Sequence, residues 1–141
     1  MVFSRQNLRP MEASPGLSER NARRSATSLE LTPRVLDDRT VVYCAGSLIL
    51  GVESDGLRDL VRKLLPNAKL IVVDLAGISM MDSGGIGTLV GLSLSARSAG
   101  AAFKLARPST RIRTLFQLTR LGVVFEILDA PEPAAAGAGT P

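Results

Sequence analysis

The six residues Leu70–Leu75, which read LIVVDL, constrain the fold of this 141-residue chain more than any other segment. The run is short, rich in β-branched residues and almost continuously apolar, which is typical of a central strand covered on both faces of a sheet. Segments with helical periodicity stand on both sides of it along the chain. The sequence therefore predicts an α/β domain organised around this strand.

Turn signals and apolar periodicity define the predicted elements before this strand. The stretches 29–36 and 40–45 alternate or are β-branched, and the polar residues 37–39 between them predict a hairpin. Pro33 cannot donate a hydrogen bond to a ladder, so its strand is predicted to lie at a sheet edge. An apolar stripe over 57–64 predicts a helix that Ser54 caps and Pro66 ends.

Two further helices are predicted after the strand, and a strand follows each of them. One helix runs from the turn at 82–85 to Gly100, before a strand over 101–106. The other runs from Pro108-Ser109 to Gly122, before a last strand over 123–128. The order β-β-α-β-α-β-α-β predicts a mixed, mostly parallel sheet with an N-terminal hairpin and helices packed on it. The first of these helices is expected to bury Ile86, Leu89, Val90 and Leu94.

Composition divides the chain into one domain and two tails. Residues 1–28 are rich in Ser and Arg, contain two prolines and lack an apolar period, which predicts a flexible N-terminal tail. Residues 131–141 form a low-complexity tail of Pro, Ala and Gly. The predicted domain spans 29–130.

Several classes of function are excluded by what the sequence lacks. It has no histidine and a single cysteine, Cys44, so it cannot form an intramolecular disulfide, a Cys/His zinc site or a His-assisted nucleophile. Of its four arginines between 107 and 120, Arg107 precedes a proline and the others are spaced as a solvated helix rim, and the chain has few aromatics, so direct nucleic-acid binding is not expected. The uncharged runs are shorter than the ~18 residues of a spanning helix. We expect a cytoplasmic protein that is not an enzyme.

The segment 78–87, ISMMDSGGIG, leads from the central strand into the next helix and is the candidate site. In open α/β sheets, ligands bind beyond the carboxyl ends of the strands, where helix N-termini present free amides. Ser83 is predicted at the first turn or N-cap, with glycines removing side chains from around its hydroxyl. A phosphoryl group there would add about −1.5 to −2 charge, favoured by the helix dipole and opposed by Asp82. Such a charge would switch a docking surface without any catalysis by this chain.

Purely structural interpretations compete with this one. Asp82 or Ser83 can be an ordinary helix cap, and the glycines can serve close approach to a neighbouring strand. No phosphate-binding glycine motif is present, so nucleotide binding at the loop is a weaker alternative. Asp74 and Asp82 are too far apart to predict an acid–base pair, and Cys44 is expected to be an inert core thiol. Met80 and Met81 are expected to pack under the loop, with Met81 adding contact area to an interface.

These residues resemble a known family. The core from about Leu29 to Leu128 resembles the STAS domain of bacterial anti-anti-sigma factors, which capture an anti-sigma kinase. The resemblance is strongest in LIVVDLAGISMMDSGGIGTLVGL, which is similar to the family's strand, its Asp-Ser-[Ser/Thr]-Gly-[Leu/Ile]-Gly turn and the helix that follows. The segment PSTRIRTLFQLTRLGVVFEI is similar to the family's last helix and strand.

The resemblance implies an anti-sigma factor antagonist without a cofactor of its own. It places Ser83 on the family's phosphorylated serine, Asp82 on the preceding acid, and Gly85 and Gly87 on its loop glycines. The unphosphorylated protein would bind a kinase-type anti-sigma factor, which would use ATP to phosphorylate Ser83, and a phosphatase would reset the cycle. The expected partner-binding residues are Met81, Asp82, Ser83, Gly84, Gly85, Gly87 and Ser47.

Two segments depart from the family pattern. Gly84 stands where the family usually has a second Ser or Thr, and Gly46-Ser47-Leu48-Ile49 stands where it commonly has Gly-Glu-[Leu/Ile]-Asp. The missing acids favour an alternative, a STAS module without phosphorylation, such as a scaffold or the accessory subunit of a lipid-transport ATPase. Self-association as a homodimer stays open.

Overall fold

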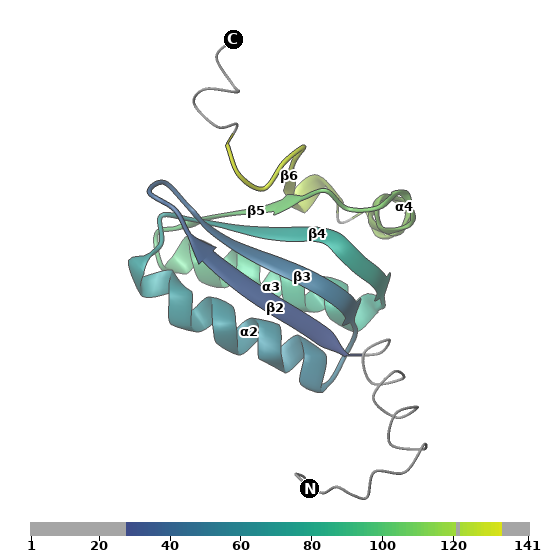
Figure 1. Ribbon diagram of the computed structural model, residues 1–141. Helices are drawn as coiled ribbons and strands as arrows, with labels where there is room; N and C mark the ends of the chain where they lie inside the picture. Colours follow the sequence, from purple (N-terminus) through teal and green to yellow (C-terminus); the bar gives the residue numbers. More distant parts are fainter. Residues whose placement is uncertain (1–27, 121, 134–141) are drawn as a thin grey trace, which may run out of the picture.

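The computed structural model describes residues 28–120 and 122–133, which form a five-stranded sheet with helices packed on it (Figure 1). The strand order is β2-β3-β4-β5-β6, with β2 antiparallel to β3 and every other pair parallel. The predicted α/β class, hairpin and element order are confirmed. The elements are β2 (Leu29–Val35), β3 (Thr40–Leu48), α2 (Val52–Leu64), β4 (Leu70–Met81), α3 (Ser83–Ser98), β5 (Ala102–Ala106), α4 (Thr110–Thr119) and β6 (Glu126–Leu128), with short 3-10 turns at Leu65–Asn67 and Gly122–Val124.

The N-terminal hairpin follows its turn chemistry. The amide of Leu36 donates to the carbonyl of Arg39 over 2.7 Å, which closes the turn between β2 and β3. Pro33 lies opposite Val42 in β2, an edge strand whose outer side makes no ladder within the described part of the chain. The predicted edge position of Pro33 is therefore confirmed.

The central strand β4 is longer than predicted. Its first half pairs with both β3 and β5, and pairing with β5 ends at Asp74. The second half, to Met81, continues only beside β3, with register shifts where β3 passes Ala45 and Ser47. The strand therefore loses one neighbour after Asp74, and its continuous run of buried residues ends one residue later, at Leu75.

Helices α2 and α3 lie side by side on one face of the sheet, whereas α4 stands apart from them on the side of β5 and β6 (Figure 1). The main core lies between the sheet and the two helices. It includes Leu57 and Val61 of α2 and Leu89 and Leu92 of α3, all fully or almost fully buried. No helix of the described residues has the length and apolar character needed to cross a membrane.

Three local predictions were wrong. Helix α2 begins at Val52, so Ser54 lies inside it and donates its hydroxyl to the carbonyl of Ile49 over 2.6 Å instead of capping the helix. Leu94 is exposed, because α3 turns Leu92 and Ala96 toward the core. Helix α4 ends at Thr119, where Arg120 takes a left-handed conformation (φ 58°).

The C-terminal part of the domain is more irregular than its sequence predicts. Residues Gly122–Val124 form a 3-10 turn, which leaves three residues for β6 instead of the predicted strand over 123–128. Phe125 packs on Phe116 of α4, with 5.6 Å between ring centroids. Of the segments assigned to tails, residues 28 and 131–133 lie within the described structure, where Pro131 is buried and Glu132 accepts a hydrogen bond from Tyr43. The rest of both predicted tails lies outside it.

Candidate functional site

Ser83 is the first residue of α3, at the carboxyl end of the central strand. Asp82 is the N-cap, and its Oδ1 accepts a hydrogen bond from the amide of Gly85 over 2.8 Å. The Ser83 side chain is exposed and has no hydrogen-bond partner among the described residues. The predicted position of Ser83 at the first turn is confirmed, and so is the capping interpretation, which falls on Asp82.

Asp82 also holds the loop between β3 and α2. The amide of Leu50 donates to both carboxylate oxygens of Asp82, over 3.2 and 3.3 Å. Because β3 and β4 are parallel neighbours, their carboxyl ends meet at one edge of the sheet, and this carboxylate joins them there. Leu50 is thereby fixed beside the start of α3.

The three glycines of the motif have different roles. A Cβ on Gly85 would lie 2.2 Å from the carbonyl oxygen of Leu48, and one on Gly84 would lie 2.5 Å from the Cβ of Leu50. A Cβ on Gly87 would meet nothing within 4 Å. Gly84 and Gly85 therefore let α3 approach the neighbouring loop and strand, as the structural interpretation predicts. Gly87 leaves an open stretch of surface one turn beyond Ser83.

The exposed surface around Ser83 contains apolar residues that sequence reasoning missed. Leu50, Val52 and Met80 are all large, apolar and more than half exposed. Their positions in the sequence were the available signal. Leu50 and Val52 follow the end of β3, and Met80 lies next to the end of β4, the parallel neighbour of β3. Met81 is partly buried, but Met80 faces solvent, so the expectation that both methionines pack under the loop was wrong for Met80. We call Leu50, Val52, Met80, Asp82, Ser83 and Gly87 the Ser83 surface.

Ser47 does not belong to the Ser83 surface. It is 2% exposed, and its amide donates to the carbonyl of Ser28 over 3.0 Å, because β3 runs here between β2 and β4. Ser47 is buried within the sheet, and its role in partner binding stays a prediction. Gly85 is also buried and lets α3 approach Leu48, and its contact with a partner stays a prediction too.

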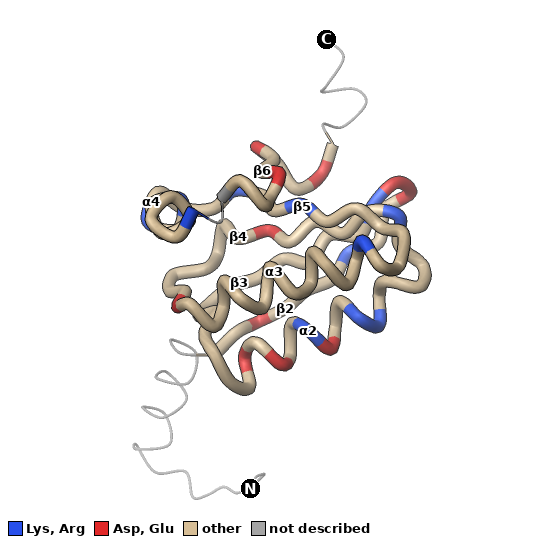
Figure 2. The backbone as a smooth tube through the Cα atoms, turned by 180° about the vertical axis from the view of Figure 1, so that it is seen from behind, with Lys and Arg blue, Asp and Glu red and all other residues tan. Residues whose placement is uncertain are grey.

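The charge around the Ser83 surface is negative. The segments 47–57 and 76–96, which build this edge of the sheet, contain Glu53, Asp55 and Asp82 and no lysine or arginine. Acidic positions mark the starts of α2 and α3 in Figure 2. Arg58, directly after the first of these segments, pairs with Asp55 over 2.9 Å and donates to the hydroxyl of Thr88 in α3 over 3.3 Å. Three acids against this one base leave the edge with net negative charge. A group bound here meets carboxylates, helix amides and apolar side chains.

Asp74, the other acid of β4, has a separate structural role. It is buried, and both its carboxylate oxygens accept hydrogen bonds from Arg107, each over 2.9 Å. The carboxylate raises the pKa of the Arg107 guanidinium by accepting these bonds. Burial, with a smaller contribution from the Asp74 charge, raises the pKa of the Cys44 thiol to about 12. Cys44 is thus buried and protonated, as expected for an inert core thiol.

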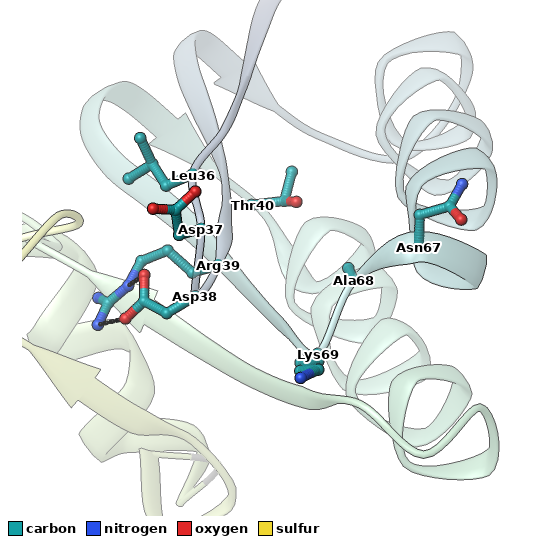
Figure 3. A pocket seen from close by; sticks show the side chains of 8 residues that line it. All are labelled: Leu36, Asp37, Asp38, Arg39, Thr40, Asn67, Ala68 and Lys69. Carbon is teal, nitrogen blue, oxygen red and sulfur yellow. Dashed lines mark hydrogen bonds and ion pairs between the residues drawn. The ribbon is translucent and has the colours of Figure 1, made fainter.

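A small polar hollow of about 90 Å³ lies at the opposite end of the sheet, where β3 and β4 begin. Figure 3 shows its lining side chains, with Asp38 paired to Arg39 over 3.2 Å. This pairing lowers the pKa of the Asp38 carboxyl. The hollow lies at the amino ends of the parallel strands, away from the edge where α/β folds bind ligands.

The comparisons with known proteins agree with this geometry. Residues 28–133 match the family model of the STAS domain, so the chain belongs to the STAS domain family. The fold is similar to that of the anti-sigma factor antagonist SpoIIAA in its unphosphorylated form, with 20% identity over 70% of this chain and 88% of that chain and a TM-score of 0.59. The Bacillus cell fate determinant SpoIIAA in its phosphorylated form matches with 21% identity, 72% and 91% coverage and a TM-score of 0.55.

Two further structures share the fold. An anti-sigma factor antagonist from Mycobacterium paratuberculosis is 17% identical over 73% of this chain and 87% of that chain, with a TM-score of 0.59. The murine anion transporter Slc26a9 is 14% identical over 73% of this chain and 20% of its own, with a TM-score of 0.55. At these identities the likeness establishes the fold.

Proposed function

We propose that this chain is a non-enzymatic anti-sigma factor antagonist that binds a kinase-type anti-sigma factor while Ser83 is unmodified and is released when Ser83 is phosphorylated. The observation that carries the proposal is the exposed hydroxyl of Ser83 at the start of α3, capped by Asp82. The likeness in fold to SpoIIAA in both its unphosphorylated and phosphorylated forms supports it. A phosphatase would restore the binding form.

The Ser83 surface has the chemistry of a protein contact. Leu50, Val52 and Met80 offer apolar area, and the absence of a side chain at Gly87 lets a partner approach the helix backbone. Methionine adds an adaptable contact. Because Glu53, Asp55 and Asp82 outnumber Arg58 around this surface, the partner is expected to present basic residues.

Phosphorylation would change this surface in a defined way. A phosphoserine adds about −1.5 to −2 charge, which the first amides of α3 stabilise. Asp82 is already bonded to the amides of Gly85 and Leu50, so it stays in place beside the phosphate. The bulk of the phosphate and the water bound to it would then keep the partner away from the apolar residues of the Ser83 surface.

The test uses an anti-sigma kinase whose gene neighbours the gene of this protein, and finding such a gene is the first step. The full chain is incubated with that kinase and ATP, and the modified residue is located by mass spectrometry. We expect modification of the wild type and of Ser98→Ala, an exposed control serine at the other end of α3, and none of Ser83→Ala. Equal modification of Ser83→Ala, or none of the wild type, would contradict the proposal.

Binding measurements complete the test. We expect Ser83→Ala to keep its affinity for the kinase, and Ser83→Asp to lose about tenfold or more, because a charge is placed among apolar contacts. Isothermal titration calorimetry measures both affinities, with the kinase bound to a nonhydrolysable ATP analogue. Equal affinities would mean that charge at residue 83 does not control docking.

A constitutive STAS module is the second candidate, and two observations favour it. Gly84, which replaces the family's second hydroxyl residue, packs against Leu50, and Ser47 is buried where the family commonly carries an acid. The chain therefore differs from the family pattern at both positions. A scaffold or an accessory subunit of a lipid-transport ATPase would bind its partner equally well before and after modification of Ser83. Transporter genes in place of a neighbouring kinase gene would favour this function.

A further inference from the structure

A second feature of the surface is a groove between α4 and the turn Gly122–Val124. Its main hollow has a volume of about 460 Å³ and is lined by Phe116, Gln117, Arg120 and Val123. A smaller hollow of about 130 Å³ adjoins it and shares Phe116 and Gln117, with Arg113 and Ile127 as its other walls. We call the two hollows together the α4 groove. Helix α4, which forms one wall of the groove, lies apart from α2 and α3 (Figure 1).

One wall of the α4 groove carries an unusually exposed apolar side chain. Val123 lines the main hollow and is 92% exposed. Single exposed apolar residues are common, but one that stands almost fully exposed on the wall of an apolar hollow marks an interaction surface.

The border of the α4 groove is positively charged. Between 107 and 125 the chain has four arginines and no acidic residue. Arg107 is occupied by Asp74, whereas Arg111, Arg113 and Arg120 are exposed and make no ion pair within the described structure. Figure 2 shows Lys and Arg positions and no acidic position on α4. The next acid along the chain, Glu126, is paired with Lys104 over 3.2 Å.

We propose that the α4 groove binds an acidic amphipathic helix of a partner protein, at a site separate from the Ser83 surface. The apolar face of such a helix would fill the hollow over Phe116 and Val123, and its flanking carboxylates would pair with Arg113 and Arg120. Helix-in-groove docking uses apolar anchors at helical spacing. Arginine binds carboxylates through two parallel hydrogen bonds, which fixes the register of the helix.

The remaining segments of this chain do not match the groove. Residues 1–27 contain five arginines and two glutamates and are net basic, and residues 134–141 contain no charged residue, so neither segment is acidic. A lipid bilayer fits less well than a helix because the hollow has two walls, and a flat surface would leave it unfilled. The charge and the concave shape together favour an acidic helix.

The test uses three synthetic helical peptides of about 18 residues that share one leucine stripe and carry Glu, Gln or Lys on the flanking positions. Each is titrated into the isotope-labelled full chain, and amide shifts are followed by NMR. We expect the Glu peptide to shift the amides of α4 and of residues 122–127, with a Kd about tenfold below that of the Gln peptide. Raising the salt from about 50 to about 500 mM should weaken the Glu peptide most, because its ion pairs are exposed.

Matched variants locate the binding. Arg113→Glu with Arg120→Glu is expected to weaken the Glu peptide about tenfold or more and to improve the Lys peptide. Val123→Ser should weaken every peptide. The controls are Arg62→Glu, an exposed arginine of α2, and Leu94→Ser, an exposed leucine of α3, which should bind as the wild type does. Every residue substituted in these four variants is exposed, and circular dichroism checks that each variant is folded.

Four outcomes would overturn the proposal. Equal affinity for the Glu and Gln peptides, or unchanged affinity in the Arg113→Glu/Arg120→Glu variant, would remove the charge argument. Binding to phosphatidylglycerol vesicles that the same variant abolishes would assign the surface to a membrane. Sedimentation showing a dimer that Val123→Ser dissociates would assign it to a second copy of the chain.

Discussion

The Ser83 surface and the α4 groove have opposite charge although one small sheet supports both. Three acids and one base, Arg58, lie around Ser83, whereas the segment 107–125 around the groove carries four arginines and no acid. Both surfaces expose large apolar residues, so charge is the property that separates them. A partner suited to one surface is repelled by the other, because like charges across an interface cost several kcal/mol. The two proposed partners would therefore not compete for one surface.

An aspartate of β4 or of the residue after it lies on each side of the molecule. Asp82 lies on the Ser83 side and Asp74 on the side of the groove, and the two differ in burial. Asp82 is exposed and accepts from backbone amides of α3 and of the β3–α2 loop. Asp74 is buried and pairs with Arg107, directly before α4. A buried charge without a partner costs much more than an exposed one. We therefore expect the loss of the Asp74–Arg107 pair to lower the free energy of unfolding more than the loss of the Asp82 cap.

Removing the partner of Asp74 tests this difference with the largest expected effect. Arg107→Met should lower the free energy of unfolding by about 3 kcal/mol, the lower end of the range for buried pairs because Arg107 itself is 46% exposed. Urea denaturation measures the change. Asp74→Leu combined with Arg107→Met should lose less than Arg107→Met alone, because no buried charge is left unpaired.

The matched control for this prediction is Arg113→Met. Arg113 is exposed and has no ion pair among the described residues, so its substitution should change stability by less than about 0.5 kcal/mol. Similar losses of unfolding free energy for Arg107→Met and Arg113→Met would mean that the Asp74–Arg107 pair does not stabilise the fold more than an exposed arginine does.

Cys44 provides a second probe of the region around Asp74. Its pKa is about 12 in the folded protein and 9.0 when unperturbed, so its stabilising effect is complete below pH 9 and is lost as the pH rises toward 12. At a pH near 11 the wild type should have lost about 2–3 kcal/mol through this thiol. Cys44→Ala should therefore show a shallower alkaline loss of stability in pH-dependent urea denaturation. Parallel pH profiles of the two proteins would contradict the assignment.

The glycines of the Ser83 side give a paired prediction of intermediate size. Gly85→Ala should destabilise the protein by about 2 kcal/mol, because the added methyl group meets a backbone carbonyl. Gly87→Ala has open space and lies inside a helix, so it should be neutral or stabilise by about 0.5 kcal/mol. Thermal unfolding compares the two. Equal effects would show that close packing against Leu48 does not matter.

The cap of α3 gives the smallest expected effect on stability. Asp82→Ala removes the acceptor for the amide of Gly85 and should cost about 1 kcal/mol, whereas Asp82→Asn keeps an N-cap oxygen and should cost less. Hydrogen exchange at the Leu50 amide should accelerate in Asp82→Ala, because that amide loses its acceptor. An unchanged exchange rate would mean that the loop is held by other contacts.

Local patterns predicted the parts of the fold that neighbours in sequence control. The apolar run before Asp74, the hairpin with Pro33 at the edge, and the helix start at Asp82 and Ser83 were all predicted correctly. The candidate serine was found because a capping acid, a hydroxyl and glycines stand together after a strand. Leu94 and Ser54 were misplaced because a pattern does not reveal which helix face the neighbouring elements leave open.

The sequence by itself determined the order of the elements, the position of Ser83 at a helix start and the chemical type of each segment, because strand, cap and turn preferences act over a few residues. Tertiary structure decided that Leu50 lies against Gly84, that Arg107 reaches Asp74 and that Ser47 is buried. It also decided that α4 and the turn after it enclose a groove. These features join residues that are distant in the chain, and their partners are set only when the strands are ordered in the sheet.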